Sequence, residues 1–277
     1  MYTDELIEIA IKEDIGDGDH TSLACIPKNA IGKAHLLVKE VGIIAGVELA
    51  EKIFKRIDSN LIFNKLMNDG SQIKKGDIVF TIEGNRQSIL QAERLALNFM
   101  QRMSGIATTT SYYVSLVDGL NTKILDTRKT TPGLREIEKL AVKIGGGQNH
   151  RIGLYDMIMI KDNHIDYAGG IEKAIKTTVE YLKTNNKQLK IEIEARDLDE
   201  LNQILNVGMV DRIMLDNFSY EDLKTAVKLI DKKYETEASG GITDKTIRNY
   251  AECGVDFISV GALTHQIKSL DLSLKAI

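Results

Sequence analysis

Helical and alternating spacings of apolar residues predict a mixed α/β region in the first part of this chain. Apolar residues at helical spacing predict helices over 3–14 and 47–57. Strands are predicted over 32–40 and 61–66, and the turn-rich stretch 69–85 indicates a small antiparallel unit. The stretch EDIGDGDHTS, which follows the first helix, is expected to be a structural loop, because its acidic spacing departs from a calcium-binding EF-hand.

A long helical pattern begins near Gln87 and continues through 108–118. One face of it collects apolar side chains, namely Ala92, Leu95, Ala96, Phe99 and Met103. We expect this helix to connect two domains. Arg94 falls on another part of its surface, and position alone indicates an ordinary exposed side chain.

From residue 122 the pattern changes, and short apolar strands alternate with amphipathic helices. About seven strand segments are expected: KILDT, GGGQNH, MIMIK, KIEIEAR, RIMLDN, EASGGI and DFISVGAL. Helices are expected over 134–143, 168–183, 198–206, 219–233 and 243–252. Such alternation predicts a parallel sheet, and a (β/α) barrel that need not be complete. The glycine fingerprints of dinucleotide-binding folds and of P-loops do not occur.

Composition narrows the class of protein. The chain has 277 residues, 43% of them hydrophobic, and a net charge of −4, which argues against nucleic-acid or acidic-membrane binding. No apolar run approaches the roughly 20 residues of a membrane span. The acidic N-terminus is neither a secretory signal nor a transit peptide, and two distant cysteines form no disulfide framework. We therefore expect a reduced, cytoplasmic enzyme.

Within this acidic chain, residues 126–164 gather seven Lys or Arg and two of the five His. These cations lie next to strand ends and glycines in the sequence, and the active sites of barrels are formed at the ends of their strands. In the order of the strands, the ends present Arg128 and Lys129, then His150 and Arg151, then Lys161. The pattern favours an anionic ligand over a solvated basic surface, whereas the cations of the intervening helix over 134–143 are expected to lie away from it.

The last two strand ends carry glycines. SGGIT and SVGALT place Ser239, Gly240, Gly241 and Gly261 ahead of the next helices. Glycines let backbone N–H groups approach an anion, and a helix N-terminus adds its dipole. Barrels often bind phosphate in these loops, so we favour a phosphate site over plain tight turns.

Two acids and one lysine leave alternatives open. Glu194 and Asp216 are expected at neighbouring strand ends, where their carboxylates could bind Mg²⁺ or stabilise a cationic sugar centre. The structural alternative is that they cap helices or form salt bridges. Lys161 suits either a Schiff base, as in barrel aldolases, or a cation that binds a carboxylate. The surrounding cations favour the second role, for a ligand with several carboxylates.

The stretch LDTRKTTPGLREIEKLAVKIGGGQNHRIGLYDMIMIKDNH closely resembles the signature region of the quinolinate phosphoribosyltransferase family, the nicotinate-nucleotide pyrophosphorylases (carboxylating). EDIGDGDHTS, QAERLALNFMQRMSGIAT, IEIEARDLDEL, IMLDNF, EASGGI and VDFISVGALTH extend the resemblance along almost the whole chain. It implies an N-terminal α/β sandwich over 1–107 and an incomplete α/β barrel over 108–265. The tail over 266–277 is expected to pack on the first domain.

The resemblance also implies roles. Quinolinate would be bound by Arg94, Arg128, His150, Arg151 and Lys161, with Arg94 supplied by the partner subunit of a homodimer. Lys129 would face phosphoribosyl pyrophosphate. Glu194 and Asp216 would lie near the ribose and Mg²⁺, bound directly or through water. Ser239, Gly240, Gly241 and Gly261 would bind phosphate. The implied reaction, a step of NAD biosynthesis, gives nicotinate mononucleotide, pyrophosphate and CO₂.

Three rival interpretations stay open on sequence. The first is a Schiff-base aldolase that uses Lys161. The second is a phosphate-ligand sensor without catalysis, which the presence of Lys161, Glu194 and Asp216 argues against. The third is a related molybdenum-system homologue, which the complete set of cations argues against.

Overall fold

The computed structural model describes residues 2–277, which form two compact units. The first unit comprises the residues up to Ser111, Thr130–Gly146 and Leu263–Ile277. The second comprises Tyr112–Lys129 and Gly147–Ala262. The units therefore differ from the predicted domains over 1–107 and 108–265, because the segment 130–146 belongs to the first unit.

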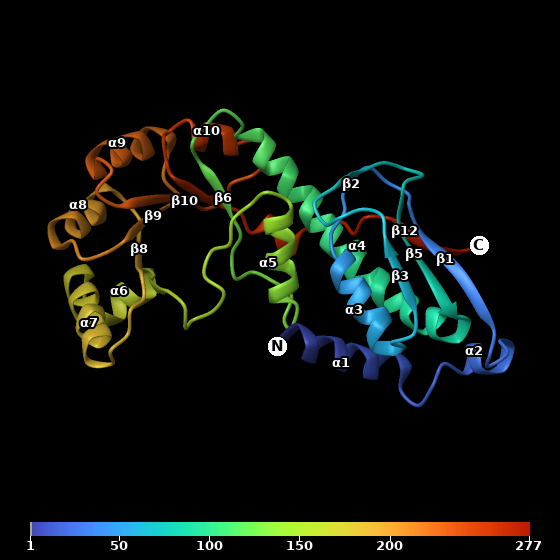
Figure 1. The fold of residues 1–277 in the computed structure, drawn as a ribbon. Coiled ribbons are helices and arrows are strands. Elements are labelled where there is room, and N and C mark those ends of the chain that lie inside the picture. Colours follow the sequence, from blue (N-terminus) through green and yellow to red (C-terminus); the bar gives the residue numbers. More distant parts are fainter. Residues whose placement is uncertain (1) are drawn as a thin grey trace. The chain divides into compact units, whose positions relative to one another are not determined.

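The first unit is built on antiparallel strands (Figure 1). Its four-stranded sheet has the order β12-β1-β5-β3, with bounds β12 Leu272–Ala276, β1 Ile31–Val38, β5 Ile78–Asn85 and β3 Ile62–Lys65. A second sheet pairs β2 (Gly42–Ile43) with β4 (Gln72–Ile73). The C-terminal tail thus contributes a sheet edge, where Leu274 pairs with Leu36 of β1.

Five helices accompany these strands: α1 Tyr2–Ile15, α2 His20–Cys25, α3 Val47–Ile57, α4 Arg86–Leu116 and α5 Arg135–Ile144. Helix α3 has the predicted bounds and buries its apolar face, and Phe54 on it lies against Phe63 and Phe80 of the sheet. The predicted loop over 13–22 is wrong at both ends, because α1 continues to Ile15 and α2 begins at His20. Asp19 accepts a hydrogen bond from the backbone N–H of Ser22, which starts the short helix α2.

The second unit contains one parallel sheet of order β6-β11-β10-β9-β8-β7. The strands are β6 Lys123–Leu125, β7 Ile158–Ile160, β8 Ile191–Ala195, β9 Arg212–Asp216, β10 Glu235–Ser239 and β11 Phe257–Ser259. The helices between and after them are α6 Asp162–Ala168, α7 Ile171–Thr184, α8 Leu198–Val207, α9 Tyr220–Ile230, α10 Ile247–Ala251 and α11 Ala262–His265. Strand–helix alternation with parallel strands is confirmed.

The expected count of about seven strands is wrong by one. The segment GGGQNH forms no strand, because its glycines end helix α5 and only Gln148 makes an isolated parallel bridge with Leu125. Strands β6 and β7 consequently form the two edges of the sheet. This open order agrees with the expectation of an incomplete barrel.

Candidate active site

The predicted site residues of the second unit gather at one edge of its parallel sheet. Glu194 lies near the carboxyl end of β8, and Asp216 and Ser239 end β9 and β10. Asp216 and Ser239 are partners in the strand register. Lys161 directly follows β7, and Gly261 lies two residues beyond β11. Five strands therefore contribute to one rim, where α/β sheets bind ligands.

Lys161 and Glu194 form an ion pair at this rim, with 3.3 Å between Nζ and Oε2. Glu194 is buried, and burial raises the pKa of its carboxyl. The ammonium of Lys161 opposes that shift, whereas the nearby charge of Asp216 adds to it. The two acids are therefore close enough to repel each other, which favours a cationic group between them.

Asn217 connects Asp216 to the glycine loop after β10. Its backbone adopts the left-handed conformation, with φ of 58°, and its N–H donates to the carbonyl of Ser239 at 2.9 Å. Its side-chain amide donates to Asp216 Oδ2 at 2.6 Å. Gly240 has φ of 101°, and a Cβ there would lie 2.2 Å from Asn217 Oδ1. Glycine is thus required at 240 by both backbone conformation and space.

The expected contribution of helix dipoles to a phosphate site is wrong for the first loop. Helix α10 begins at Ile247, six residues after Gly241, and it has only five residues. Helix α11 begins at Ala262, next to Gly261, but has only four residues. Anion binding here would depend on backbone N–H groups of the glycine loops rather than on long helices.

The cations after β6 and in the segment 147–151 also approach one another. The pKa of Arg151 is lowered by burial and by the positive charge of Arg128. Arg151 Nη1 donates to the carbonyl of Met157 at 3.2 Å, which fixes the guanidinium. Arg128 and Lys129 are exposed, and the N–H of Lys129 donates to Thr127 Oγ1 at 3.0 Å. Like charges held close together favour a multiply charged anion.

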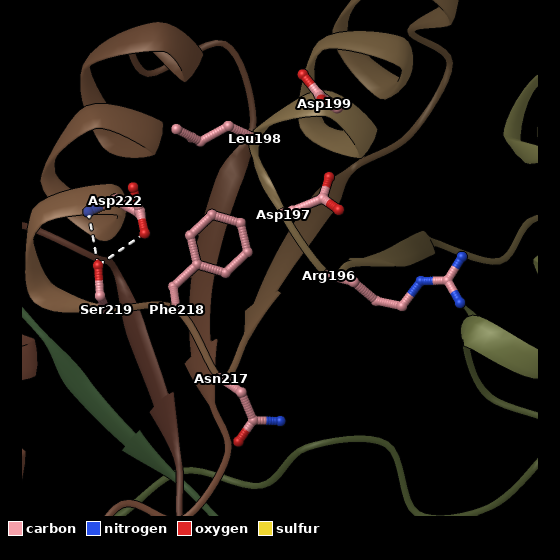
Figure 2. Close-up of a pocket in the computed structure, with 8 residues that line it drawn as sticks. All are labelled: Arg196, Asp197, Leu198, Asp199, Asn217, Phe218, Ser219 and Asp222. Atoms are coloured by element: carbon pink, nitrogen blue, oxygen red, sulfur yellow. Dashed lines mark hydrogen bonds between the residues drawn. The ribbon is translucent and has the colours of Figure 1, made fainter.

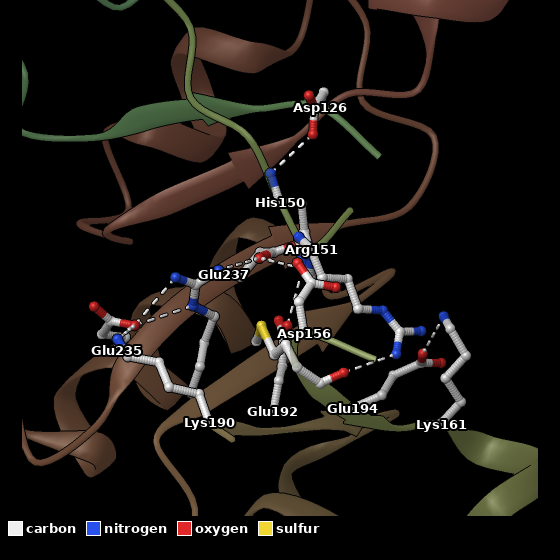
Figure 3. A network of polar contacts seen from close by, with 12 residues as sticks. Asp126, His150, Arg151, Asp156, Lys161, Lys190, Glu192, Glu194, Glu235 and Glu237 are labelled. Carbon is white, nitrogen blue, oxygen red and sulfur yellow. Dashed lines mark hydrogen bonds and ion pairs between the residues drawn. The ribbon is translucent and has the colours of Figure 1, made fainter. Parts of the chain in front are cut away.

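His150 is buried and lies beside Arg151 (Figure 3). Its backbone N–H donates to Asp126 Oδ1 at 2.8 Å, and its Nδ1 accepts the N–H of Arg151 at 2.7 Å. Its Nε2 lies 2.9 Å from Glu192 Oε2 and 3.4 Å from Glu237 Oε2. The ring is therefore held from several sides inside the protein.

Glu192 and Glu237 did not figure among the predicted site residues. Both are fully buried, and each lies two residues before a predicted one, Glu194 and Ser239, on the same strand face. Burial and the charge of Glu237 raise the pKa of Glu192 to about 7. The period-two spacing of IEIE and of ETEAS was the signal that could have revealed them.

Two further residues support the scaffold. His164 Nδ1 accepts the backbone N–H of Lys161 at 2.9 Å and so caps helix α6. In the first unit, Arg102 donates to the buried Glu138 and to Thr131 Oγ1, at 2.8 and 2.6 Å. This contact ties α4 to the segment that follows Lys129.

Arg94 lies on helix α4 in the first unit and is exposed. Its predicted role in binding quinolinate therefore stays a proposal. The pocket in Figure 2 is lined by three acids, Asp197, Asp199 and Asp222, together with Arg196 and Asn217. Of these, Asp197 caps α8 and Asp222 bonds to Ser219, so they serve the starts of two helices.

Glu194 and Asp216 offer only carboxylate oxygens, the donor type that Mg²⁺ takes in proteins. Their mutual repulsion and the half-exposed end of Asp216 fit an ion held by one or two carboxylates with water and substrate. The residues present therefore suit the group that the sequence resemblance implies.

Cations beside paired acids and glycine loops, on the rim of a parallel sheet, define an enzyme that acts on a multiply charged anion. Residues 106–275 match the family model of the quinolinate phosphoribosyl transferase C-terminal domain, and residues 19–104 match that of its N-terminal domain. The chain belongs to the quinolinate phosphoribosyltransferase family.

Individual relatives agree with this assignment. The chain is 47% identical over 285 residues to the chloroplastic nicotinate-nucleotide pyrophosphorylase (carboxylating) of Arabidopsis thaliana, covering 98% of this chain and 81% of that protein. It is 41% identical to the probable enzyme of Bacillus subtilis, covering 95% and 89%. The solved nicotinate-nucleotide pyrophosphorylase of Francisella tularensis superposes with a TM-score of 0.92 at 42% identity, covering 100% and 96% of the two chains. Among residues 2–277, no helix has the length and apolar character needed to cross a bilayer.

Proposed function

We propose that this chain transfers the phosphoribosyl group of phosphoribosyl pyrophosphate to quinolinate, with loss of CO₂, to give nicotinate mononucleotide and pyrophosphate. The observation that carries the proposal is the meeting of Arg128, Arg151 and Lys161 with two acids at one rim. Family membership supplies the substrates, since the named relatives are quinolinate phosphoribosyltransferases and nicotinate-nucleotide pyrophosphorylases.

The cations would bind the two carboxylates of quinolinate. The guanidinium groups of Arg128 and Arg151 offer paired donors that match a carboxylate, and Lys161 offers a point charge. Because burial and Arg128 both lower the pKa of Arg151, an anion between the arginines would relieve their repulsion. His150 stands at the base of this group, beside Arg151.

The acids would act on the sugar. The ring nitrogen of quinolinate attacks ribose C1′ while the C1′–O bond breaks and its electron pair leaves with pyrophosphate. Glu194 and Asp216 stabilise the positive charge that develops on the sugar. Lys129 offsets negative charge on the leaving group. Mg²⁺, held by Glu194 and Asp216 directly or through water, would neutralise pyrophosphate.

Decarboxylation follows from the chemistry of the product ring. The alkylated pyridinium accepts the electrons of the C2–carboxylate bond as CO₂ departs, and a proton then takes the place of the carboxylate at C2. The cations orient the dicarboxylate for this step. Ser239, Gly240, Gly241 and Gly261 would bind phosphate through backbone N–H groups, which the required glycine at 240 supports.

We also propose a homodimer with shared sites, in which Arg94 of one subunit completes the quinolinate site of the other. Two observations support it. Arg94 is exposed on α4. In the second unit Leu154, Tyr155 and Tyr167 are 71%, 72% and 90% exposed, a set of apolar side chains that a partner surface would cover.

A cytoplasmic location is also proposed. Cys25 and Cys253 are both free thiols, which suits a reducing compartment. The aldolase alternative is disfavoured by the ion pair of Lys161, because an ammonium paired with a carboxylate is not a nucleophile.

The test is turnover of quinolinate with phosphoribosyl pyrophosphate and Mg²⁺, followed as formation of nicotinate mononucleotide. Nicotinate in place of quinolinate is the control, because it lacks the second carboxylate that the cations would bind. The proposal requires turnover of quinolinate and a large preference for it over nicotinate. Equal use of the two acids, or borohydride trapping of substrate on Lys161, would contradict it.

A further inference from the structure

The interior of the second unit holds a buried set of charged side chains below the proposed quinolinate site (Figure 3). Glu192 and Glu237 are fully buried, and Arg212 is 9% exposed. Arg212 pairs with Glu237 at 3.2 Å and with Glu235 at 3.1 Å. Interiors of such barrels are ordinarily filled by branched apolar residues, so this composition needs a reason.

Stability does not supply that reason. Buried ion pairs lose solvation that their attraction repays only with good geometry, and apolar residues of similar volume often stabilise as well or better. Here burial raises the pKa of Glu237, whereas a hydrogen bond from Ser259 and the charge of Arg212, which donates to this carboxylate at 3.2 Å, lower it. Glu237 is therefore ionised at full burial. Such a buried charge is better explained by a neighbouring side chain that it keeps in position.

What the two acids hold is the ring of His150. The N–H of Arg151 donates to Nδ1 at 2.7 Å, and this bond requires a lone pair on Nδ1. The proton of the ring then belongs on Nε2, which faces Glu192 and Glu237 at 2.9 and 3.4 Å. The carboxylates outweigh burial and raise the pKa of His150 to about 9, yet an imidazolium would direct a second N–H at that of Arg151. We therefore assign the neutral ring with its proton on Nε2.

We propose that Glu192 and Glu237 are positioning residues that act through His150, fixing its tautomer and thereby the backbone of Arg151 at the quinolinate site. The proposal rests on the proposed function for its substrate, but its geometry concerns the protein alone. The path is continuous: carboxylates to Nε2, Nδ1 to the N–H of Arg151, and Arg151 to the carbonyl of Met157.

A metal ion is the competing occupant, because ligand atoms of His150, Glu192 and Glu237 lie within 4.8 Å of one another. One feature argues against it. Arg212 already donates to the Glu237 oxygen that faces the ring, so a positive charge is present on this side of the acids without an ion.

The test combines kinetics with nitrogen NMR of His150 in full-length Glu192→Gln and Glu237→Gln protein. Glu235→Gln is the matched control, because Glu235 lies on β10 and pairs with Arg212 without contacting His150. We expect wild type to show a protonated Nε2 and a bare Nδ1. In the two test variants this tautomer signal shifts, and kcat/KM for quinolinate falls on the order of tenfold to a hundredfold, the size of one lost hydrogen bond to a charged group. KM for phosphoribosyl pyrophosphate and the control's kinetics stay within about twofold.

Several results would overturn the proposal. They are a wild-type ring protonated on Nδ1, unchanged His150 signals and kinetics in both test variants, or stoichiometric Zn²⁺ or Mn²⁺ that perturbs His150. If a variant fails to fold, the wild-type spectrum still decides the tautomer. If wild type does not turn over quinolinate, the proposed function fails separately, since the NMR measurement needs no substrate.

Discussion

Lys161 and Glu194 form an ion pair between the ends of neighbouring strands β7 and β8, with 3.3 Å between Nζ and Oε2. The lysine belongs to the proposed carboxylate-binding group, and the acid is one of the two that are proposed to face the sugar. The pair therefore joins the binding of quinolinate to the stabilisation of the reacting ribose.

Lys161→Ala should reduce kcat/KM for quinolinate by about a hundredfold or more, the loss expected when one charge-stabilising donor is removed. The fold should persist, because Lys161 is only half-buried and its removal leaves no cavity in the core. Lys190→Ala is the control, since Lys190 pairs with Glu235 at the other end of the same sheet. Steady-state kinetics with both variants decides the matter, and equal activity in Lys161→Ala and wild type would remove Lys161 from the site.

Sharing of sites between subunits predicts complementation. Arg94→Ala and Lys161→Ala proteins, each inactive alone, should regain up to about a quarter of wild-type activity after mixing, because half of randomly exchanged dimers carry one intact site. A mixture of Arg128→Ala and Lys161→Ala should regain none, since both changes fall in the same site. Absence of recovery in the first mixture, with exchange shown by mass spectrometry, would argue that each site is built from one chain.

Gly240→Ala should weaken binding of phosphoribosyl pyrophosphate. The new Cβ would meet Asn217 Oδ1 at 2.2 Å, so Asn217 must move and release its bond to Asp216. We expect KM for this substrate to rise by about tenfold or more. Gly254→Ala provides the control, because Gly254 has a similar φ of 92° but a Cβ there meets only Val227 at 3.6 Å. It should lose about 1–2 kcal/mol of stability through backbone strain and keep its KM.

Asp69 and Asp58 predict opposite effects of pH on stability in the first unit. Burial raises the pKa of Asp69 above 3.8 although the N–H of Val47 donates to it, so its stabilising contribution is present below pH 3.8 and lost as pH rises through the folded pKa. The N–H of Asn60 lowers the pKa of Asp58, whose contribution is present above pH 3.8 and lost as pH falls. The free energy of unfolding, measured with denaturant between pH 3 and 6, tests both signs. As pH rises, wild type should lose stability relative to Asp69→Asn. Over the same range it should gain stability relative to Asp58→Asn. Parallel curves for the two variants would contradict these signs.

Sequence patterns predicted the elements whose signals are local. Helix α3 was predicted with its observed bounds, and in the structure the helix ends where Asp58 adopts an extended conformation. Helix α2 was missed because its polar residues resemble a loop until Asp19 caps them. The segment GGGQNH was predicted to be a strand because it comes between two helix–strand boundaries of an alternating series. Its glycines at 145–147 form no strand, and only Gln148 makes a bridge.

Strand ends likewise predicted most of the cluster, because parallel strands bring their carboxyl ends to one rim. The support beneath it could not be predicted in the same way. Glu192 and Glu237 lie within strands rather than at their carboxyl ends, and only the pairing of β8, β9 and β10 shows that both reach His150. The contact of Arg102 with the buried Glu138 could not be predicted locally either, because the two residues lie 36 positions apart in the chain.

The central claim is that phosphoribosyl transfer to quinolinate is coupled to decarboxylation in this site. Quinolinate labelled with ¹⁴C in its 2-carboxylate, incubated with phosphoribosyl pyrophosphate and Mg²⁺, tests it most directly. We predict release of labelled CO₂ and of pyrophosphate in equal amounts, with unlabelled nicotinate mononucleotide as product. Pyrophosphate release with the label retained in the nucleotide, or no release of either product, would contradict the account.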